Sequence, residues 1–121
     1  MKLLIVEDSQ PVRDRLHSLF SEMQGLETVV AANLEQAVAS FRQLAPEVVL
    51  ADIQLPDGSG LDLLGIVKRE RPHTRVLMIS NHAFYRKRCL AEGADHFFDK
   101  SMDLEAMTTT VRTLSEAANE G

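Results

Sequence analysis

The feature of this sequence that most constrains its fold is a short apolar run that ends at a single acid. The run from Val48 to Ala51 contains no polar residue, Asp52 follows it, and Pro56, Gly58 and Gly60 then prevent a strand from continuing. A run without polar alternation is typical of a strand that is covered on both faces, as in a parallel sheet. Asp52 is therefore expected at the carboxyl end of a central parallel strand, the edge where open α/β sheets bind ligands. An aspartate here is equally compatible with a turn or a helix cap.

The size and composition fit one domain, which we expect to comprise residues 1–121. The chain has 121 residues, of which 45% are hydrophobic and 26% are charged. Its one cysteine, Cys89, cannot form an internal disulfide, and the apolar run at the N-terminus meets an acidic pair too soon for a signal peptide or a membrane span. We therefore expect a cytoplasmic protein that does not bind membranes. The net charge of −5 argues against nucleic-acid binding by this domain.

Apolar strand patterns alternate with helical patterns along the whole chain. Strands are predicted at Lys2–Val6, Thr28–Ala32, Val48–Ala51, Arg75–Ile79 and Asp95–Phe98. The first three helices are predicted after the N-cap residue Ser9 up to Gly25, after the cap Asn33 to about Leu44, and from Leu61 to Arg71. The last two are predicted from Ala83 to Glu92 and from Leu104 to Ala118, the latter with Ser101 or Asp103 as cap. We expect the polar tail, Glu116 to Gly121, to fray. Five strands that alternate with five helices through short connections predict right-handed βαβ units and a parallel sheet.

Charged and hydroxyl side chains stand where these strands end. Glu7 and Asp8 follow the first strand, Asp52 ends the third, and Ser80 and Lys100 follow the fourth and fifth. If the strand of Asp52 lies beside the first and fourth strands, these side chains converge on one pocket. Three carboxylates there would repel one another by about 4 kcal/mol per pair at 4 Å in an effective dielectric of about 20. A hard divalent cation, Mg²⁺ above all, would resolve this repulsion.

An acid, a metal, an ammonium group and a hydroxyl group together suit phosphoryl transfer to a carboxylate. Asp52 would attack the phosphorus and become an aspartyl phosphate, while the metal and Lys100 neutralise oxygen charge. The same metal could instead hold a water for hydrolysis. Each residue alone also has an ordinary explanation: Glu7 and Asp8 as a helix-start pair, Ser80 as a turn residue, and Lys100 as a surface charge. Their joint occurrence at strand ends favours the functional interpretation.

Four stretches of the sequence resemble the receiver domains of two-component response regulators. They are LLIVED, VVLADIQLPDGSG, VLMIS and GADHFFDKS, and the resemblance extends over nearly the whole chain. It implies a flavodoxin-like, doubly wound α/β fold with a five-stranded parallel sheet in the order 2-1-3-4-5 and five helices. It also implies Asp52 as phosphoacceptor, and Mg²⁺ held by Asp8, Asp52 and the backbone carbonyl of Gln54. Glu7 would contact the ion through a water molecule, or would contact one of the residues that bind it.

The resemblance further implies that Ser80 and Lys100 contact the phosphoryl group and that Phe97 is the aromatic switch residue. The sequence departs from the family where Ser101 follows Lys100, because the family usually has a proline in a cis peptide there. Either the Lys100–Ser101 peptide is trans with a different reach for the lysine, or a cis bond that costs about 3 kcal/mol is tolerated. Phe97 lacks the hydroxyl of the common tyrosine, so we expect its ring to lean inward even before phosphorylation.

Gln54 and His82 occupy the positions two after the phosphoacceptor and two after the hydroxyl residue. There they would flank the attacking water, and we predict that they set the lifetime of the phosphoryl group. His82 is equally compatible with an exposed loop histidine. The remaining histidines, His17, His73 and His96, show no metal-ligand spacing and are expected at the surface or at an edge.

The predicted fourth helix carries the basic run Arg86-Lys87-Arg88 in an otherwise acidic chain. With Phe84, Tyr85, Phe97 and the last helix, it could be the face that reports phosphorylation to a partner, although such a run is more often a solvated helix surface. Whether activation also brings dimerisation through the last two helices is left open by the sequence.

Three functions compete at this stage. The first is a phosphorylation-dependent switch, not an enzyme, that receives its phosphoryl group from a histidine kinase or a phosphotransfer protein and signals to an unidentified downstream protein. A variant of it is the receiver of a longer transcription regulator. The second is a phosphohydrolase that forms an aspartyl phosphate, against which Gln54 stands where an acid would commonly act. The third, a receiver-like partner-binding domain without phosphorylation, does not explain why repelling acids are kept together.

Overall fold

Five parallel strands form the centre of the molecule. The computed structural model describes residues 1–120, and its strands are β1 Lys2–Val6, β2 Glu27–Ala31, β3 Val48–Asp52, β6 Arg75–Ser80 and β7 His96–Asp99. They are arranged in the order β2-β1-β3-β6-β7. When only these five strands are counted, this is the predicted order 2-1-3-4-5, so the expected doubly wound sheet is confirmed.

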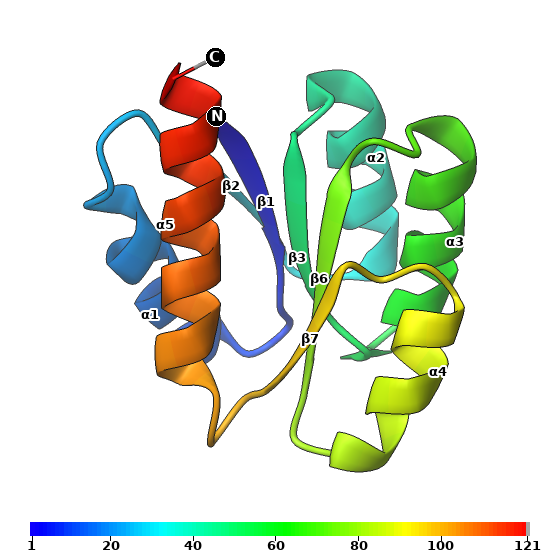
Figure 1. The fold of residues 1–121 in the computed structure, drawn as a ribbon. Helices are drawn as coiled ribbons and strands as arrows, with labels where there is room; N and C mark the ends of the chain where they lie inside the picture. Colours follow the sequence, from blue (N-terminus) through cyan, green and yellow to red (C-terminus); the bar gives the residue numbers. More distant parts are fainter. Residues whose placement is uncertain (121) are drawn as a thin grey trace.

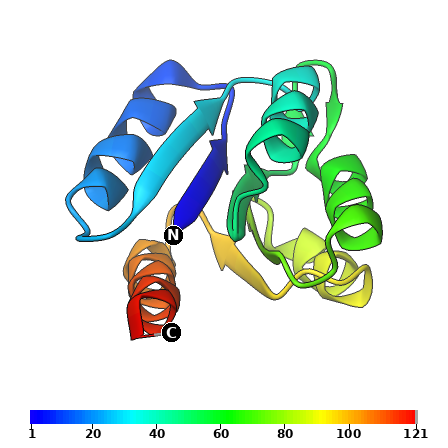
Figure 2. The same ribbon diagram turned by 90° about the horizontal axis from the view of Figure 1, so that it is seen from above.

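Helices cover both faces of this sheet. Figure 1 shows α1 and α5 on one face and α2, α3 and α4 on the other, and Figure 2 shows the same two layers from above. The helices are α1 Gln10–Ser21, α2 Leu34–Leu44, α3 Gly60–Glu70, α4 Arg86–Ala91 and α5 Leu104–Glu120. Among the described residues, none of the helices combines the length with the apolar composition that a membrane span requires.

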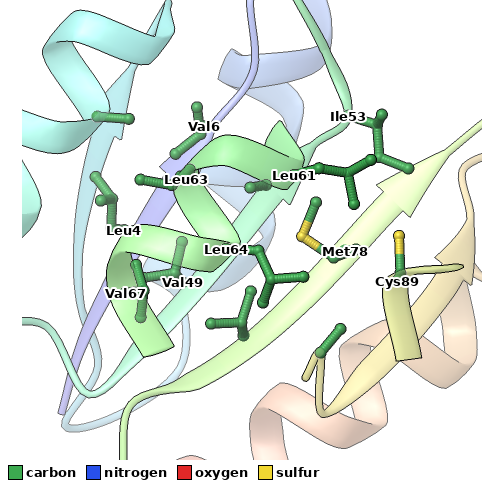
Figure 3. Packing of buried hydrophobic residues seen from close by; sticks show 14 of the residues in the cluster. Leu4, Val6, Val49, Ile53, Leu61, Leu63, Leu64, Val67, Met78 and Cys89 are labelled. Atoms are coloured by element: carbon green, nitrogen blue, oxygen red, sulfur yellow. The ribbon is translucent and has the colours of Figure 1, made fainter. Parts of the chain in front are cut away.

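Strand β3 explains why the Val48 run has no polar residue. Every residue of β3 is buried, and successive side chains point to opposite faces, each of which has its own hydrophobic cluster. Val49 and Ala51 belong to the cluster under α2 and α3, whereas Val48 and Leu50 belong to the cluster under α1 and α5. Figure 3 shows the first cluster, in which side chains of α3 pack on the sheet: Leu61, Leu63, Leu64 and Val67 above Leu4, Val49 and Met78.

The region predicted as one helix from Ala83 to Glu92 is divided into two pieces. A 3₁₀ turn, η1 Ala83–Tyr85, precedes the short α-helix α4. Neither His82 nor Tyr85 caps the following helical piece with its side chain. Without a cap the first amides bond in the tighter 3₁₀ pattern, as between the Tyr85 amide and the His82 carbonyl at 3.2 Å.

The predicted ends of the first and last helices are partly wrong. Helix α1 ends at Ser21, well before Gly25. Helix α5 continues to Glu120, beyond the predicted end at Ala118, and Gly121 lies outside the described residues, so the fraying of the tail stays a prediction. One reason is that Asn119 donates a hydrogen bond to the Gln24 carbonyl at 3.4 Å, which attaches the last turns of α5 to the loop after α1.

The predicted cap residues precede their helices, but not every one of them makes a capping hydrogen bond with its side chain. The Asn33 side chain accepts a hydrogen bond from the Gln36 amide, as predicted, whereas the Ser9 side chain makes no capping bond. The Asp103 carbonyl accepts the Met107 amide at the start of α5. The Asp103 carboxylate is bonded elsewhere, as described below.

A small hairpin follows β3 that the sequence did not predict. Its strands are β4 Gln54–Leu55 and β5 Gly58–Ser59. Gly60, directly after it, lies against the backbone of β3, where its amide donates to the Ile53 carbonyl at 2.7 Å. A side chain at Gly60 would collide with the Asp52 carbonyl group. The glycine therefore lets the chain turn back beside Asp52.

Candidate functional site

The strand register brings the predicted site residues to one edge of the sheet. Val6 pairs with Ala51, so Glu7 comes beside Asp52, and Asp52 itself pairs with Ile79, directly before Ser80. The β7–α5 loop begins beside the same edge, because the Lys100 amide donates to the Ser80 carbonyl at 3.0 Å.

Three carboxylates form a tight acidic cluster at this edge. Oxygens of Glu7, Asp8 and Asp52 lie within 4.8 Å of one another. Glu7 is fully buried and Asp52 is 7% exposed, whereas Asp8 lies at the surface. The cluster is therefore open to solvent on the side of Asp8 and closed on the side of Glu7.

Lys100 bridges the two buried acids. Its Nζ donates to Glu7 Oε1 and to Asp52 Oδ2, each at 2.6 Å. Burial raises the pKa of Glu7 to about 7; the Asp52 charge adds to this effect and Lys100 opposes it. Burial alone would lower the pKa of Lys100, but its bonds to Asp52 and Glu7 raise that pKa above its ordinary value. The ammonium group is therefore charged, and the two buried acids share it.

The donor set fits a hard divalent cation. Three carboxylates lie close together and only two of them are paired with Lys100, which leaves excess negative charge in a confined place, and all of their donor atoms are oxygens. Mg²⁺ favours one or two carboxylates together with waters and phosphate oxygens, and the exposed side of Asp8 leaves room for such ligands. The residues present thus fit the ion that the sequence predicts.

Ser80 lies at the end of β6 and is 2% exposed. Its Oγ accepts a hydrogen bond from the His82 amide at 3.0 Å, which leaves the hydroxyl hydrogen for another acceptor. The His82 ring is exposed and packs near two aromatic rings, at 5.4 Å from Phe84 and 6.5 Å from Tyr85 between centroids. The structure therefore places His82 in an exposed aromatic cluster close to the site.

Gln54 is exposed at the start of the hairpin after β3. Its amide lies 3.4 Å from Asp52 Oδ1 as a hydrogen-bond donor. The same hairpin is attached to α2 by Asp57, whose two carboxylate oxygens accept the Leu34 and Glu35 amides at 2.7 and 2.9 Å. These bonds hold the pKa of Asp57 below its ordinary value. Helix α2 thus fixes the loop that carries Gln54.

The structure also shows the conformation of the Lys100–Ser101 peptide and the orientation of the Phe97 ring. No peptide bond among the described residues is cis, so the Lys100–Ser101 peptide is trans, and Lys100 still reaches Asp52. The Phe97 side chain points inward, since the residue is only 3% exposed. The inward orientation agrees with the expected preference of a ring without a hydroxyl.

A cavity of about 430 Å³ adjoins the acidic cluster between α1 and the start of α5. Its polar rim includes Glu7, Asp8 and Lys100, and its floor includes Leu16 and Met107. The three remaining histidines of the chain are exposed, as predicted, and lie outside this cavity.

Some residues that shape the site were not predicted. Arg13 donates from Nη1 to the carbonyls of Glu7 and Asp8 at 3.0 and 3.3 Å, which fixes the acidic pair after β1. The capping role of Asp57 was also missed, because the amides that it caps lie more than 20 residues away. Only the helix-capping character of aspartate after a proline could have suggested it.

The comparisons with known proteins agree with this geometry. Residues 3–112 match the response regulator receiver domain family. A response regulatory protein of Yersinia pestis is 31% identical over 95% of this chain and 48% of its own length. The response regulator protein PilR of Pseudomonas aeruginosa is 33% identical over 98% of this chain and 28% of its own length.

Solved structures show the same fold. The response regulator protein TrrA of Thermotoga maritima, crystallised in complex with Mg²⁺-BeF, has a TM-score of 0.84 at 26% identity and covers 93% of this chain and 97% of its own. The chemotaxis response regulator CheY4 of Vibrio cholerae has a TM-score of 0.83 at 22% identity over 93% and 96%.

The fold and the site define a doubly wound α/β domain with an acidic centre at the carboxyl edge of its sheet. Together with the family match over residues 3–112, they show that the chain belongs to the receiver domain family of two-component response regulators. The chain spans about half the length, or less, of the two curated relatives described above.

Proposed function

We propose that residues 1–121 form a receiver domain whose Asp52 accepts a phosphoryl group in the presence of Mg²⁺. The observation that carries this proposal is the cluster of Glu7, Asp8 and Asp52 oxygens within 4.8 Å, with Lys100 bonded to two of them. Such a cluster concentrates the charge and the donors that phosphoryl transfer to a carboxylate requires. The donor is a histidine kinase or a phosphotransfer protein, and the exchange takes place in the cytoplasm.

In this proposal Asp52 is the nucleophile. One of its carboxylate oxygens forms a bond to phosphorus while the bond from phosphorus to the donor nitrogen breaks, and the donor histidine keeps the electron pair. Lys100 moves from the Asp52 carboxylate to a phosphoryl oxygen and retains Glu7, and the Ser80 hydroxyl donates to another oxygen. Asp8, Asp52 and the Gln54 carbonyl would hold Mg²⁺, with Glu7 assisting. The ion would neutralise charge on the phosphoryl oxygens when bound.

Hydrolysis of the aspartyl phosphate then resets the switch, so the domain assists its own dephosphorylation without being a turnover enzyme. Gln54 and His82 are both exposed and follow the two strands that carry Asp52 and Ser80. We assign to them the lifetime of the phosphoryl group, through steric exclusion or orientation of the attacking water.

The signal leaves the domain through the face formed by α4, β7 and α5. Movement of Ser80 and Lys100 toward the phosphoryl group would change the packing of Phe97 and α4, and so the affinity for a downstream protein. Shifting a two-state equilibrium from 1:99 to 99:1 requires roughly 5.5 kcal/mol, which a few charge-assisted hydrogen bonds can approach. Dimerisation through the same face is an alternative output.

A second form of the proposal is that the chain is the receiver part of a longer transcription regulator. It is favoured by the fact that the relative PilR and the Yersinia protein are much longer than the matched region. The chemistry at Asp52 is the same in both forms, and only the output differs.

Intact mass spectrometry tests the proposal. The chain is incubated with a small phosphodonor such as acetyl phosphate, with Mg²⁺ or with a chelator, as wild type and as Asp52→Asn. We expect one phosphoryl group on the wild type only with Mg²⁺, and none on the variant. Equal phosphorylation of the two proteins, or none on either with any donor, would refute the proposal.

A further inference from the structure

Arg86, the first residue of α4, extends across β7 toward the start of α5. Its Nη1 donates to the Phe97 carbonyl at 3.3 Å, and its Nη2 lies 3.5 Å from Asp103 Oδ2. The centre of its guanidinium group is 5.0 Å from the centroid of the Phe97 ring. One side chain thus contacts two elements besides its own, and we call these contacts the Arg86 bridge.

The carboxylate at the far end of the Arg86 bridge holds the loop that carries Lys100. Asp103 Oδ2 accepts the Asp99 amide at 2.8 Å, and the Asp103 amide donates to the Asp99 carbonyl at 3.0 Å. Lys100 directly follows Asp99 in the loop, and its Nζ reaches the buried acids. A chain of contacts thus runs from Arg86 through Asp103 to Asp99, the residue before Lys100.

The Arg86 bridge also covers the Phe97 ring. The ring packs in the hydrophobic cluster under α2 and α3, and Tyr85 packs against the same cluster. The guanidinium group lies over the Phe97 ring, so we expect an outward rotation of Phe97 to displace it and to separate Arg86 from Asp103. The ion pair is half-exposed, so it can open without unfolding the domain.

We propose that Arg86 is a positioning residue for the reaction at Asp52. It holds Lys100 at the acidic cluster through Asp103, and it holds Phe97 inside through its contact with the ring. The consequence for Asp52 rests on the proposed function, whereas the hold on the loop exists without any phosphoryl group. An arginine suits this place, because its planar fork donates to two acceptors and stacks on a ring at the same time.

Hydrogen exchange tests the hold on the loop without phosphorylation. In Arg86→Ala, the amides of residues 99–103 should exchange about threefold to tenfold faster than in the wild type, as expected from the loss of a surface ion pair and a hydrogen bond. Arg88→Ala is the matched control, because Arg88 pairs only locally, with Glu92 directly after α4, at 2.8 Å. Circular dichroism establishes that both variants are folded.

Phosphorylation kinetics test the consequence at Asp52. With acetyl phosphate and Mg²⁺, we expect Arg86→Ala to be phosphorylated about threefold to tenfold more slowly, with Arg88→Ala unchanged. Arg86→Lys should be intermediate, because an ammonium group can pair with Asp103 but lacks the two separate nitrogens with which the guanidinium group reaches both Asp103 and the Phe97 carbonyl. The double variant Arg86→Ala/Asp103→Asn should be phosphorylated no more slowly than the slower of the two single variants, since both substitutions remove the same ion pair.

Tyrosine fluorescence reports the surroundings of Tyr85, which packs against the cluster that contains Phe97, because the chain has one tyrosine and no tryptophan. We expect the emission to differ from the wild type in Arg86→Ala but not in Arg88→Ala. The proposal is overturned if Arg86→Ala and Arg88→Ala agree in exchange and emission, or if the loop loosens while the phosphorylation rate stays the same. A wild type that is never phosphorylated refutes the proposed function instead, and the exchange experiment still decides whether Arg86 holds the loop.

Discussion

Replacing Gly60 by alanine should destabilise the domain by pressing against the backbone that carries Asp52. The new Cβ would lie 2.9 Å from the Asp52 carbonyl carbon, closer still to its oxygen, and 3.1 Å from the Ile53 Cα. These are backbone atoms, so no side chain can rotate away. Carbon atoms in ordinary contact are about 3.5 to 4.0 Å apart, so β3 and α3 must separate by roughly 0.5 to 1 Å.

Two effects of Gly60→Ala lower the free energy of unfolding, and one raises it. Overpacking of this kind costs about 1 to 3 kcal/mol, and a weakened bond from the Gly60 amide to the Ile53 carbonyl costs about 0.5 to 1.5 kcal/mol more. The helical preference of alanine over glycine returns up to about 1 kcal/mol. We expect a net loss of about 2 to 3 kcal/mol, which corresponds to roughly 8 to 12 °C in Tm for a domain of this size.

Urea denaturation followed by far-ultraviolet circular dichroism measures this loss. Gly65→Ala is the matched control in the same helix, because its Cβ would meet only the tip of the Arg69 side chain, at 3.6 Å. That substitution should stabilise the domain by about 0.5 to 1 kcal/mol. If Gly60→Ala were as stable as the wild type, or if both substitutions cost the same, the steric argument at Asp52 would be wrong.

Three other predictions concern charge and capping. Burial alone would raise the pKa of Asp95, but hydrogen bonds from Lys68 and the Val76 amide lower this pKa below its ordinary value of 3.8. The Asp95 carboxylate therefore stabilises the fold above that pH, and this stabilisation is lost as the pH falls through the lower pKa of Asp95 in the folded state. Asp95→Asn should thus be less stable than the wild type at neutral pH, and the difference between the denaturation curves should shrink progressively as the pH falls below about 4; a constant difference would contradict this. Millimolar Mg²⁺ should raise the Tm of the wild type more than that of Asp8→Asn, whereas equal rises would argue against Asp8 as a ligand. Asp57→Ala should lower the Tm and speed amide exchange in the first turn of α2, and unchanged exchange there would show that the cap is dispensable.

The fold could be predicted from the sequence because its decisive signals are local. The unbroken apolar run before Asp52 reflects burial of β3 on both faces, and the acids directly after β1 and at the end of β3 mark the strand ends. Once these strands are neighbours, the meeting of Glu7 and Asp52 follows from parallel register, and the long side chain of Lys100 reaches them from the loop after β7. The core of the candidate site could therefore be predicted from the sequence alone.

The contacts that were not predicted depend on how elements pack against each other. The cap that Asp57 places on α2 and the pair of Arg86 with Asp103 join residues that no spacing rule connects. Ser9 shows the converse, since a residue of the right type stands at the N-cap position and its side chain makes no capping bond. Local propensity identifies candidates for such roles, and the tertiary arrangement selects among them.

The central claim is that Asp52, among the three clustered acids, receives the phosphoryl group, and borohydride reduction of the phosphorylated chain tests it most directly. Borohydride converts an aspartyl phosphate to homoserine, which peptide mapping then locates. The account predicts homoserine at position 52 only, and only after treatment with both phosphodonor and Mg²⁺. Homoserine at position 8, or reduction of Glu7 in place of Asp52, would contradict it.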